Sequence, residues 1–272
     1  MLNKIKALQN HLKIIRQIQI QNSIYQQLTR NPRYNNRINR YEKQVFSQGG
    51  EDGIISEIFN RVGTTNKTFV EFGVGDGLEN NTAFLLMQGW KGFWLEYSDK
   101  NIENIHKNFR YIINKNLKVK QAFITTKNVE SLFKKMNIPK AFDFLSIDID
   151  GNDYWVWNAI KSYTPNVVCI EYNSIIPPNV SWTIKYDPKF IRKTENIYYG
   201  ASLKALEKLG ISKGYCLIGC NFHGVNTFFV RKDLIKDKFP KPYTAEHCYE
   251  PCRFHLLTKI GHKRVFGEYE TP

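Results

Sequence analysis

The feature that most constrains the fold of this chain is a regular alternation of strand-like and helical segments, which begins near residue 46. Short runs that are apolar on both faces predict strands at residues 68–73, 92–96, 118–124, 142–149 and 167–172. Parallel strands that are covered by helices on both faces have this character. Helical patterns separate the runs, so this part of the chain consists of five βα units. We therefore predict an α/β fold with an open, doubly wound sheet.

Two further strand-like runs, at residues 215–218 and 227–230, end the pattern. The loop that joins them is short and contains glycine. A parallel crossover needs about a dozen or more residues, so two runs that lie this close in the sequence must pair in the antiparallel direction. The sequence therefore predicts a mostly parallel sheet that ends in an antiparallel hairpin.

Residues 1–44 differ from the rest of the chain in charge and in pattern. Basic residues exceed acidic ones by 39 − 25 = 14 overall, and residues 1–45 hold nine basic residues and one acid. Apolar residues recur at spacings of three and four from Leu2 to Ile15, which predicts an amphipathic helix, and Asn31-Pro32 ends the pattern. Such a helix docks on an anionic membrane or a partner protein, or it packs on its own domain or on a dimer mate. The sequence leaves these alternatives open.

The composition excludes several classes of protein. Hydrophobic residues make up 42% of the chain and charged residues 24%, which is ordinary for a globular protein. No apolar run approaches the roughly 18–20 residues of a membrane span. The five cysteines are too few and too unevenly spaced for a disulfide scaffold. We expect a soluble cytoplasmic protein with reduced thiols.

A glycine-rich motif follows the first predicted strand: Glu71-Phe-Gly73-Val-Gly75-Asp-Gly77. Glycines here let backbone N–H groups approach a ligand. A dinucleotide-binding fingerprint needs a third glycine where this chain has Leu78. The motif instead resembles the first motif of S-adenosylmethionine (SAM) methyltransferases, which implies that the glycines cradle the methionine half of SAM. The alternative is a plain strand-to-helix turn.

Acidic and small residues at the next two strand ends extend this resemblance. Glu96 ends the second strand, and the resemblance implies that its carboxylate accepts hydrogen bonds from the ribose hydroxyls of SAM. Ala122 and Phe123 end the third strand, where such folds flank the adenine. A solvated strand end is the alternative for Glu96.

Two carboxylates, Asp148 and Asp150, lie at the end of the fourth strand, and like charges this close resist joint ionisation unless a cation or donor lies between them. The run from residue 142 resembles a strand of catechol-type, metal-dependent O-methyltransferases, in which the first Asp binds a divalent cation beside the acceptor. Glu171 and Asn173 follow the fifth strand and would supply further oxygen ligands for Mg²⁺ or Mn²⁺. The alternative is that these groups hold the substrate or the amino group of SAM directly.

In combination, these motifs resemble the FkbM-like SAM methyltransferases. The matching segments lie at residues 47–54, 71–77, 80–82, 145–157, 170–173 and 226–231. The resemblance implies a Rossmann-like class I methyltransferase fold and O-methylation of a small polar acceptor, often a sugar or a metabolite of a glycan pathway. It also implies that Gln48, Asn81, Thr82 and Asp148 contact the cofactor.

The resemblance covers roughly residues 45–235. We therefore expect a basic helical extension over residues 1–44, the methyltransferase domain over residues 45–240 and a C-terminal tail over residues 241–272. Within the domain, Asp148 is the candidate catalytic group. His223 lies in the loop between the last two strands and is a candidate general base, with a solvated loop side chain as the alternative.

Two other functions were weighed against a small-molecule O-methyltransferase. The positive charge is typical of a nucleic-acid methyltransferase, but the N-P-P-Y-type signature of amino-methylating DNA enzymes is absent. The core also lacks interleaved arginines and aromatic residues, so no nucleic-acid partner is expected. A non-catalytic interaction module is the third possibility, and the presence of Glu71 and Glu96 argues against it.

Overall fold

The structure is a computed structural model that describes residues 2–192, 196–253, 269–270 and 272. Its main sheet has seven strands in the order β3-β2-β1-β4-β5-β8-β7. The strands are β1 (Thr68–Phe72), β2 (Lys91–Glu96), β3 (Leu117–Gln121), β4 (Ala141–Ile147), β5 (Thr164–Glu171), β7 (Tyr215–Cys220) and β8 (Asn226–Arg231). Strands β1 to β5 are parallel, while β8 is antiparallel to both β5 and β7. The predicted doubly wound sheet with a C-terminal antiparallel hairpin is confirmed.

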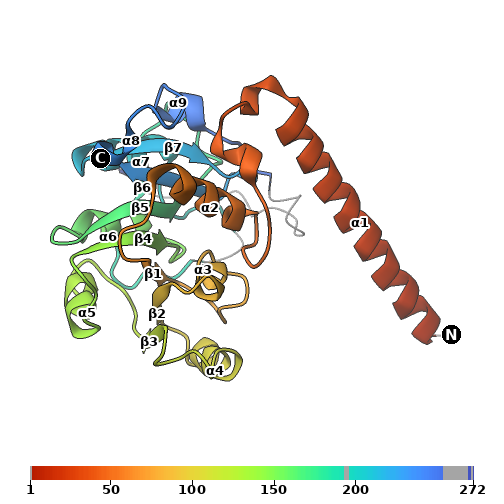
Figure 1. Cartoon of the computed structure of the whole chain (residues 1–272), viewed down its shortest axis with the longest axis horizontal. Helices are drawn as coiled ribbons and strands as arrows, with labels where there is room; N and C mark the ends of the chain where they lie inside the picture. The colour runs from red at the N-terminus through yellow and green to blue at the C-terminus, as the bar shows by residue number, and fades with distance from the viewer. Residues whose placement is uncertain (1, 193–195, 254–268, 271) are drawn as a thin grey trace.

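Helices cover both faces of this sheet (Figure 1). One face packs on α5 (Val129–Lys135), α6 (Asp153–Ala159) and α7 (Leu203–Ser212), and the other on α2 (Glu51–Val62), α3 (Ala83–Met87) and α4 (Asp99–Asn108). Strand β5 shows why the strands are apolar throughout, since Val168 and Ile170 join the first layer while Val167 and Cys169 join the second. Side chains alternate along a strand, so a strand buried on both faces needs apolar residues at every position.

The connection from β5 to α7 is long and largely irregular. It carries β6 (Thr183–Ile184), which pairs antiparallel with β9 (Tyr269–Glu270) in a separate two-stranded sheet. Two short helices follow β8, namely α8 (Lys232–Ile235) and α9 (Ala245–Cys248). The long connection leaves the sheet where β5 ends, at the same sheet edge as the ends of β1 and β4.

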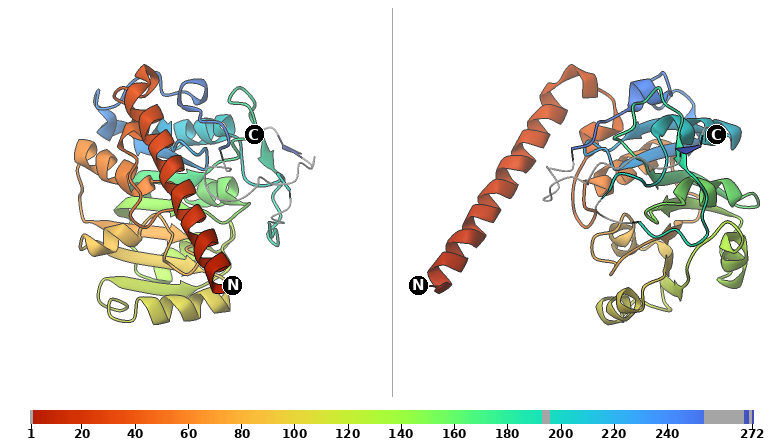
Figure 2. Two further views of the ribbon diagram at one scale, coloured as in Figure 1. Left: turned by 90° about the vertical axis from the view of Figure 1, so that its right-hand side faces the viewer. Right: turned by 180° about the vertical axis from the view of Figure 1, so that it is seen from behind.

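The N-terminal helix α1 (Leu2–Arg30) projects away from the rest of the molecule, with the N-terminus at its far end (Figures 1 and 2). The chain turns at Asn31, whose side chain accepts a hydrogen bond from the Arg33 amide and caps the 3₁₀ helix η1 (Pro32–Tyr34). Leu28 is buried against Tyr34 and Phe222, so the last turns of α1 contact the body. None of the described helices combines the length and the apolar character that a membrane span requires.

The segment between α1 and α2 is built into the body. Ile38, in the 3₁₀ helix η2 (Ile38–Tyr41), is fully buried in the core layer of α2. A side chain at Gly219 would come within 2.7 Å of Ile38, so the close packing requires glycine there. The Asn39 amide donates a hydrogen bond to the Cys220 carbonyl.

The segment after residue 240 also packs on the body, since Ala245, Cys248 and Glu250 are buried. Glu250 accepts a hydrogen bond from the Tyr34 hydroxyl at 3.2 Å. Residues 31–44 and 241–253 therefore belong to the same packed unit as the sheet. The boundaries expected at residues 44 and 240 do not separate them from it, and the rest of the expected tail lies largely outside the described residues.

Candidate functional site

A cavity of about 200 Å³ lies at the carboxyl ends of β1 and β4. The strand order reverses direction between these two strands, which is where doubly wound sheets bind their ligands. The cavity lining carries the carboxylates of Glu51, Glu71, Asp76, Glu79 and Asp148. No Lys or Arg is among the described residues that line it. The cavity lining is therefore acidic and suits a cationic ligand.

Two of the predicted glycines line the cavity and fit it for different reasons. Gly73 has φ +68°, and a Cβ there would lie 1.6 Å from the Asp148 carbonyl oxygen, so β1 can pass Asp148 only with glycine at this position. Gly75 has φ +59° and no atom within 4 Å of a built Cβ, so its backbone faces open space. Gly77 does not line the cavity and packs instead against the ring of Trp94.

Glu71 is buried at the base of the cavity. Its carboxylate accepts hydrogen bonds from the Asn81 amide at 3.0 Å and from the Thr82 hydroxyl. Thr82 in turn accepts a hydrogen bond from the Trp94 indole at 2.8 Å. Burial raises the pKa of Glu71 to about 7, against these hydrogen bonds, which lower it. Asn81 lines the cavity, whereas Thr82 is fully buried and positions Glu71.

Glu96 is buried where β2 ends, and its carboxylate connects three backbone amides. One oxygen accepts hydrogen bonds from the amides of Tyr97 and Ser98 at 3.0 and 2.9 Å, and the other accepts one from Gly75 at 3.0 Å. The buried carboxylate excludes the alternative of a solvated strand end. Glu96 therefore fixes the glycine loop relative to the end of β2.

The predicted adenine-flanking residues lie next to Glu96. The Ala122 amide donates a hydrogen bond to the Glu96 carbonyl at 2.9 Å. Phe123 is exposed and meets Tyr97 edge-on, with ring centroids 5.9 Å apart. Glu96, Ala122 and Phe123 thus share one surface at the ends of β2 and β3, beside the cavity but outside its lining.

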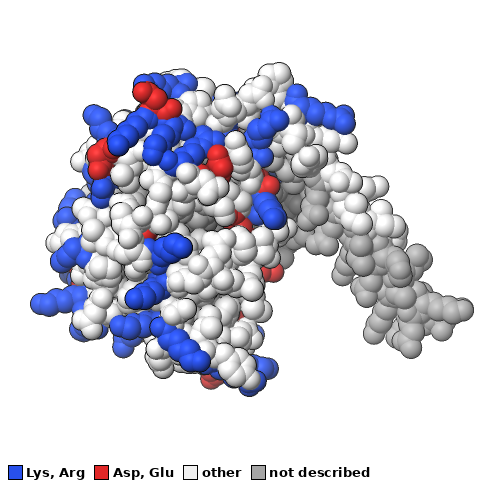
Figure 3. Space-filling view, viewed as in Figure 1, with Lys and Arg blue, Asp and Glu red and all other residues white. Residues whose placement is uncertain are grey.

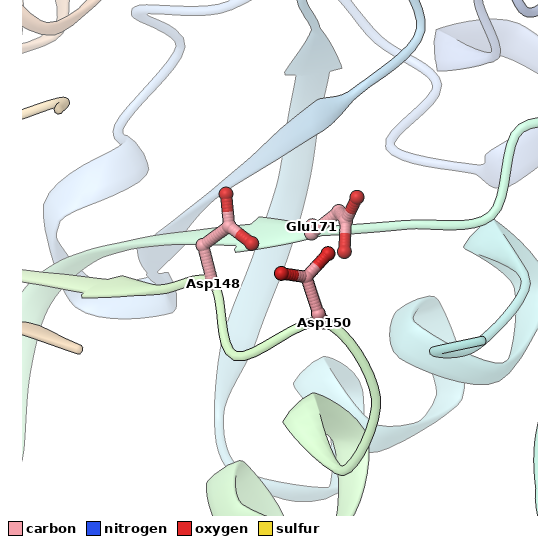
Figure 4. Close-up of side chains that lie close together, drawn as sticks. All are labelled: Asp148, Asp150 and Glu171. Atoms are coloured by element: carbon pink, nitrogen blue, oxygen red, sulfur yellow. The ribbon is translucent and has the colours of Figure 1, made fainter. Parts of the chain in front are cut away.

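Three carboxylates meet at the ends of β4 and β5 (Figure 4). Asp148 follows β4, Asp150 lies in the next turn and Glu171 ends β5, and one oxygen of each lies within 4.8 Å of the others. Burial, together with Asp150, raises the pKa of Asp148 well above its usual range. Burial, together with Asp148, does the same to the pKa of Glu171. One Glu171 oxygen, Oε2, has no hydrogen-bond partner among the described residues.

Arg192 supplies a positive charge to this acidic cluster (Asp148, Asp150 and Glu171). Its guanidinium donates hydrogen bonds to Asp150 and, at 3.3 Å, to Glu171. The Cζ atom of Arg192 lies 3.7 Å from the centroid of the Tyr199 ring. Burial lowers the pKa of Arg192, but the attraction of the carboxylates outweighs burial and raises it. Sequence reasoning missed Arg192, because nothing in the irregular segment after β5 marks one basic residue as facing the sheet.

Asn173 does not join the acidic cluster as predicted. Its side-chain amide donates hydrogen bonds to the carbonyls of Ile197 and Tyr199 at 2.8 and 3.1 Å, and its oxygen accepts one from the Ile175 amide at 3.3 Å. Asn173 therefore holds the long connection in place. The third member of the group of converging side chains, beside Asp148 and Glu171, is Asp150.

The remaining predicted residues, Gln48 and His223, have different surroundings. Gln48 lines the cavity and donates a hydrogen bond to Glu79 at 3.3 Å. His223 is buried beside Phe222 and does not line the cavity, and its carbonyl accepts a hydrogen bond from the Arg253 amide. The alternative of a solvated loop histidine is wrong, and the group of converging carboxylates at the ends of β4 and β5 does not include His223.

Glu51 is a site residue to which sequence reasoning gave no role. It lies at the start of α2, lines the cavity and accepts a hydrogen bond from the Gly49 amide at 2.8 Å. Its other oxygen accepts hydrogen bonds from the side chains of Asn221 and Asn226 at 2.6 and 3.1 Å. Glu51 thus joins the loop before α2 to the β7–β8 hairpin. Consecutive acids directly after a glycine pair were the available signal, since acids favour helix N-termini.

No protein-family model matches this chain, and no curated protein matches its sequence. Similar solved structures include the N-terminal domain of EvdMO1 with SAH bound, at 11% identity over 70% of this chain and 80% of that one, with a TM-score of 0.42. The glycopeptide N-methyltransferase MtfA complexed with SAM is 12% identical over 70% and 96% of the two chains, with a TM-score of 0.42. An O-methyltransferase from Bacillus cereus in complex with SAH is 18% identical over 65% and 78%, with a TM-score of 0.42. Values this low do not transfer an activity to this chain.

Proposed function

We propose that this chain is a SAM-dependent methyltransferase, and the charge of its cavity is the observation that carries the proposal. SAM bears a positive sulfonium and a positive α-ammonium and has no phosphate. Five carboxylates line the cavity, with no described Lys or Arg among the lining residues. Such a lining attracts both charges of SAM and repels the pyrophosphate of a dinucleotide, and opposite charges attract strongly where water is partly excluded.

The geometry supports a definite placement of SAM. The backbone of Gly73 and Gly75 borders the cavity, so the methionine half would lie against it. The ribose would lie against Glu96, whose carboxylate uses three of its roughly four lone-pair sites on backbone amides. One ribose hydroxyl would donate to the lone-pair site of Glu96 that remains free. The second hydroxyl would donate to the site that the Gly75 amide now occupies, in place of that amide. The exposed rings of Tyr97 and Phe123 then border the adenine.

The acidic cluster supports a role for Asp148 in the transfer itself. An acceptor hydroxyl oxygen would attack the methyl carbon of SAM in line with the C–S bond, which breaks to leave S-adenosylhomocysteine. The hydroxyl proton would pass to Asp148, which lines the cavity. Burial raises the pKa of Asp148 well above its usual range, and a raised pKa makes a carboxylate a better base near neutral pH.

The same cluster fits a divalent cation, which we include in the proposal. Asp148, Asp150 and Glu171 offer three oxygens within 4.8 Å, and Oε2 of the buried Glu171 has no described partner. Oxygen donors of this kind suit Mg²⁺ or Mn²⁺. A bound cation would acidify a coordinated hydroxyl. Arg192 already places one positive charge there, so the cation would have to displace its guanidinium from Asp150 or Glu171.

We further propose that the chain is FkbM-like and O-methylates a small polar acceptor of sugar type. The support is spatial. Residues of separate motifs of that resemblance, namely Gln48, Gly73, Asn81, Asp148 and Asn226, line one cavity although they span most of the chain. Motifs that had only a structural purpose would have no reason to meet at a single ligand-sized space.

Calorimetry with SAM, S-adenosylhomocysteine and NAD tests the cofactor. We expect one SAM per chain and no measurable NAD binding, and the absence of SAM binding would refute the proposal.

Methyl transfer to a panel of sugars and nucleotide sugars, assayed by release of S-adenosylhomocysteine, tests the acceptor. Asp148→Asn should abolish turnover, whereas Asp76→Asn, at another carboxylate of the cavity lining, should weaken SAM binding but retain turnover at saturating SAM. Turnover in excess EDTA equal to that with added Mg²⁺ would exclude the cation.

A further inference from the structure

The N-terminal part of α1 exposes a stripe of large apolar side chains. At about 1.5 Å per residue the helix is roughly 43 Å long. Among the described residues, its contact with the body lies near its C-terminal end (Figure 2). Leu12, Ile15 and Ile18 are 58%, 50% and 52% exposed. Three neighbouring apolar side chains exposed to this extent, at helical spacing, indicate a surface that another molecule covers.

The exposed stripe is not a continuation of the face that packs on the body. Leu28 packs on the body and is 16 residues after Leu12. At about 100° per residue, this separation places the two side chains roughly 160° apart around the helix. By the same count Ile15 lies roughly 140° and Ile18 roughly 80° from Leu28 around the helix. Leu12 and Ile15 therefore face away from the contact that holds α1, and the helix cannot bury them together with Leu28 by lying closer to its own sheet.

The charge of the segment decides what covers the stripe. Residues 1–41 contain eight basic residues and no acid. Two copies of α1 would bring like charges together, with no carboxylate on either helix to pair with them. Figure 3 shows Lys and Arg side chains spread over the visible face of the body, with fewer Asp and Glu, so this face of a second copy is mainly basic.

We propose that α1 docks on an anionic phospholipid surface, with Leu12, Ile15 and Ile18 inserted among the acyl chains. Exposed Arg16 lies one turn after Leu12, so its apolar stem can follow the stripe while its guanidinium reaches a lipid phosphate. A basic amphipathic helix binds in the plane of the interface through buried apolar area and attraction to anionic lipid. The body is thereby held beside a membrane.

The charge contribution can be stated as a factor in binding. Each Lys or Arg near an anionic leaflet is worth about 1 kcal/mol, which is roughly a fivefold change in the partition constant. Removing two basic residues should therefore weaken binding about 25-fold. Salt should weaken it as well, because the Debye length falls from ~10 Å at 0.1 M to ~3 Å at 1 M.

The experiment is co-sedimentation of the full chain with vesicles of phosphatidylcholine alone and of phosphatidylcholine with 30% phosphatidylglycerol. We expect binding to the anionic vesicles, loss of that binding at 1 M salt, and little binding to the neutral ones. Lys13→Gln/Arg16→Gln should weaken it about 25-fold, and the triple variant Leu12→Asn/Ile15→Asn/Ile18→Asn should abolish it. Gln19→Ala/Gln26→Ala changes exposed positions of the same helix without altering its charge and is the matched control.

Light scattering and SAM calorimetry complete the design. All variants should remain monomeric and bind SAM as the wild type does, so a membrane defect is separated from misfolding and from the proposed function. Equal binding to neutral and anionic vesicles, or no vesicle binding by the wild type, overturns the proposal. A wild-type dimer that the triple variant splits into monomers overturns it in favour of pairing between copies. If the triple variant aggregates, the charge variant alone decides.

Discussion

Replacement of Glu71 by Gln tests whether burial at the base of the cavity controls the ionisation of this carboxyl group. The carboxyl is 2% exposed, and burial raises its pKa from 4.5 to about 7. At about 1.36 kcal/mol per pKa unit, ionised Glu71 destabilises the folded chain by roughly 3 kcal/mol. The unfolded chain releases this proton near pH 4.5 and the folded chain near pH 7. Between these values the folded state binds more protons, so the free energy of unfolding falls as the pH rises.

Glu71→Gln removes this ionisation and with it the pH dependence. The difference in unfolding free energy between the variant and the wild type should rise by about 3 kcal/mol from pH 4.5 to pH 8. This difference is measured by urea unfolding of the ligand-free wild type and variant at several pH values, monitored by tryptophan fluorescence. Glu79→Gln at the exposed rim of the cavity is the control and should leave the pH dependence as in the wild type. A Glu71→Gln difference that stays constant with pH would refute the reasoning.

The same group should couple SAM binding to pH. A cationic ligand favours the ionised carboxylate, so the affinity of the wild type for SAM should rise as the pH increases through about 7. Binding near pH 7 should release a proton, which calorimetry in buffers of different ionisation enthalpy detects. Glu71→Gln should bind SAM weakly and without proton release. Proton release of the same size from the variant would place the coupled group elsewhere.

Three further substitutions test other parts of the structure. Glu96→Gln should weaken SAM binding by about 1–3 kcal/mol in calorimetry, because the ribose hydroxyls lose a charged acceptor; unchanged affinity would remove Glu96 from the site. Gly73→Ala should abolish stable folding in urea denaturation, because its Cβ would lie 1.6 Å from a carbonyl oxygen, whereas Gly75→Ala should cost only about 1–2 kcal/mol. Ile38→Ala should lower the unfolding free energy by about 2–5 kcal/mol, while Ile18→Ala on exposed α1 should change it little; equal effects would contradict the assignment of residues 31–44 to the body.

Sequence periodicity was sufficient to predict the sheet, because strands buried on both faces must be apolar at every position. Val167 to Ile170 illustrate this, since alternate residues join opposite core layers. The position of the glycine loop beside Glu96 could also be predicted from the sequence. Both follow consecutive parallel strands, so they must meet at one edge of the sheet. Residues at the ends of adjacent parallel strands lie close together whatever the connecting loops do.

The contributions that sequence reasoning missed come from irregular backbone. Arg192 reaches Glu171 through a connection without regular periodicity, so no spacing rule places it. Ile38 is a buried apolar side chain among polar and basic neighbours, and the local composition therefore resembled an exposed extension. Its burial depends on the absence of a side chain at Gly219, which lies far away in the sequence.

The attachment of the N-terminal segment also sets an order of events during synthesis. Arg33 and Tyr34 contact Tyr249 and Glu250, which lie 216 residues later in the chain. At about 5–20 residues per second, a ribosome needs roughly 10–40 s to make the residues between them. Throughout that time Arg33 and Tyr34 lack these two hydrogen-bond partners, although Phe222, on which Tyr34 packs, is made earlier. A nascent chain that stops before Tyr249 therefore cannot form these two links between its N-terminal segment and the segment after β8.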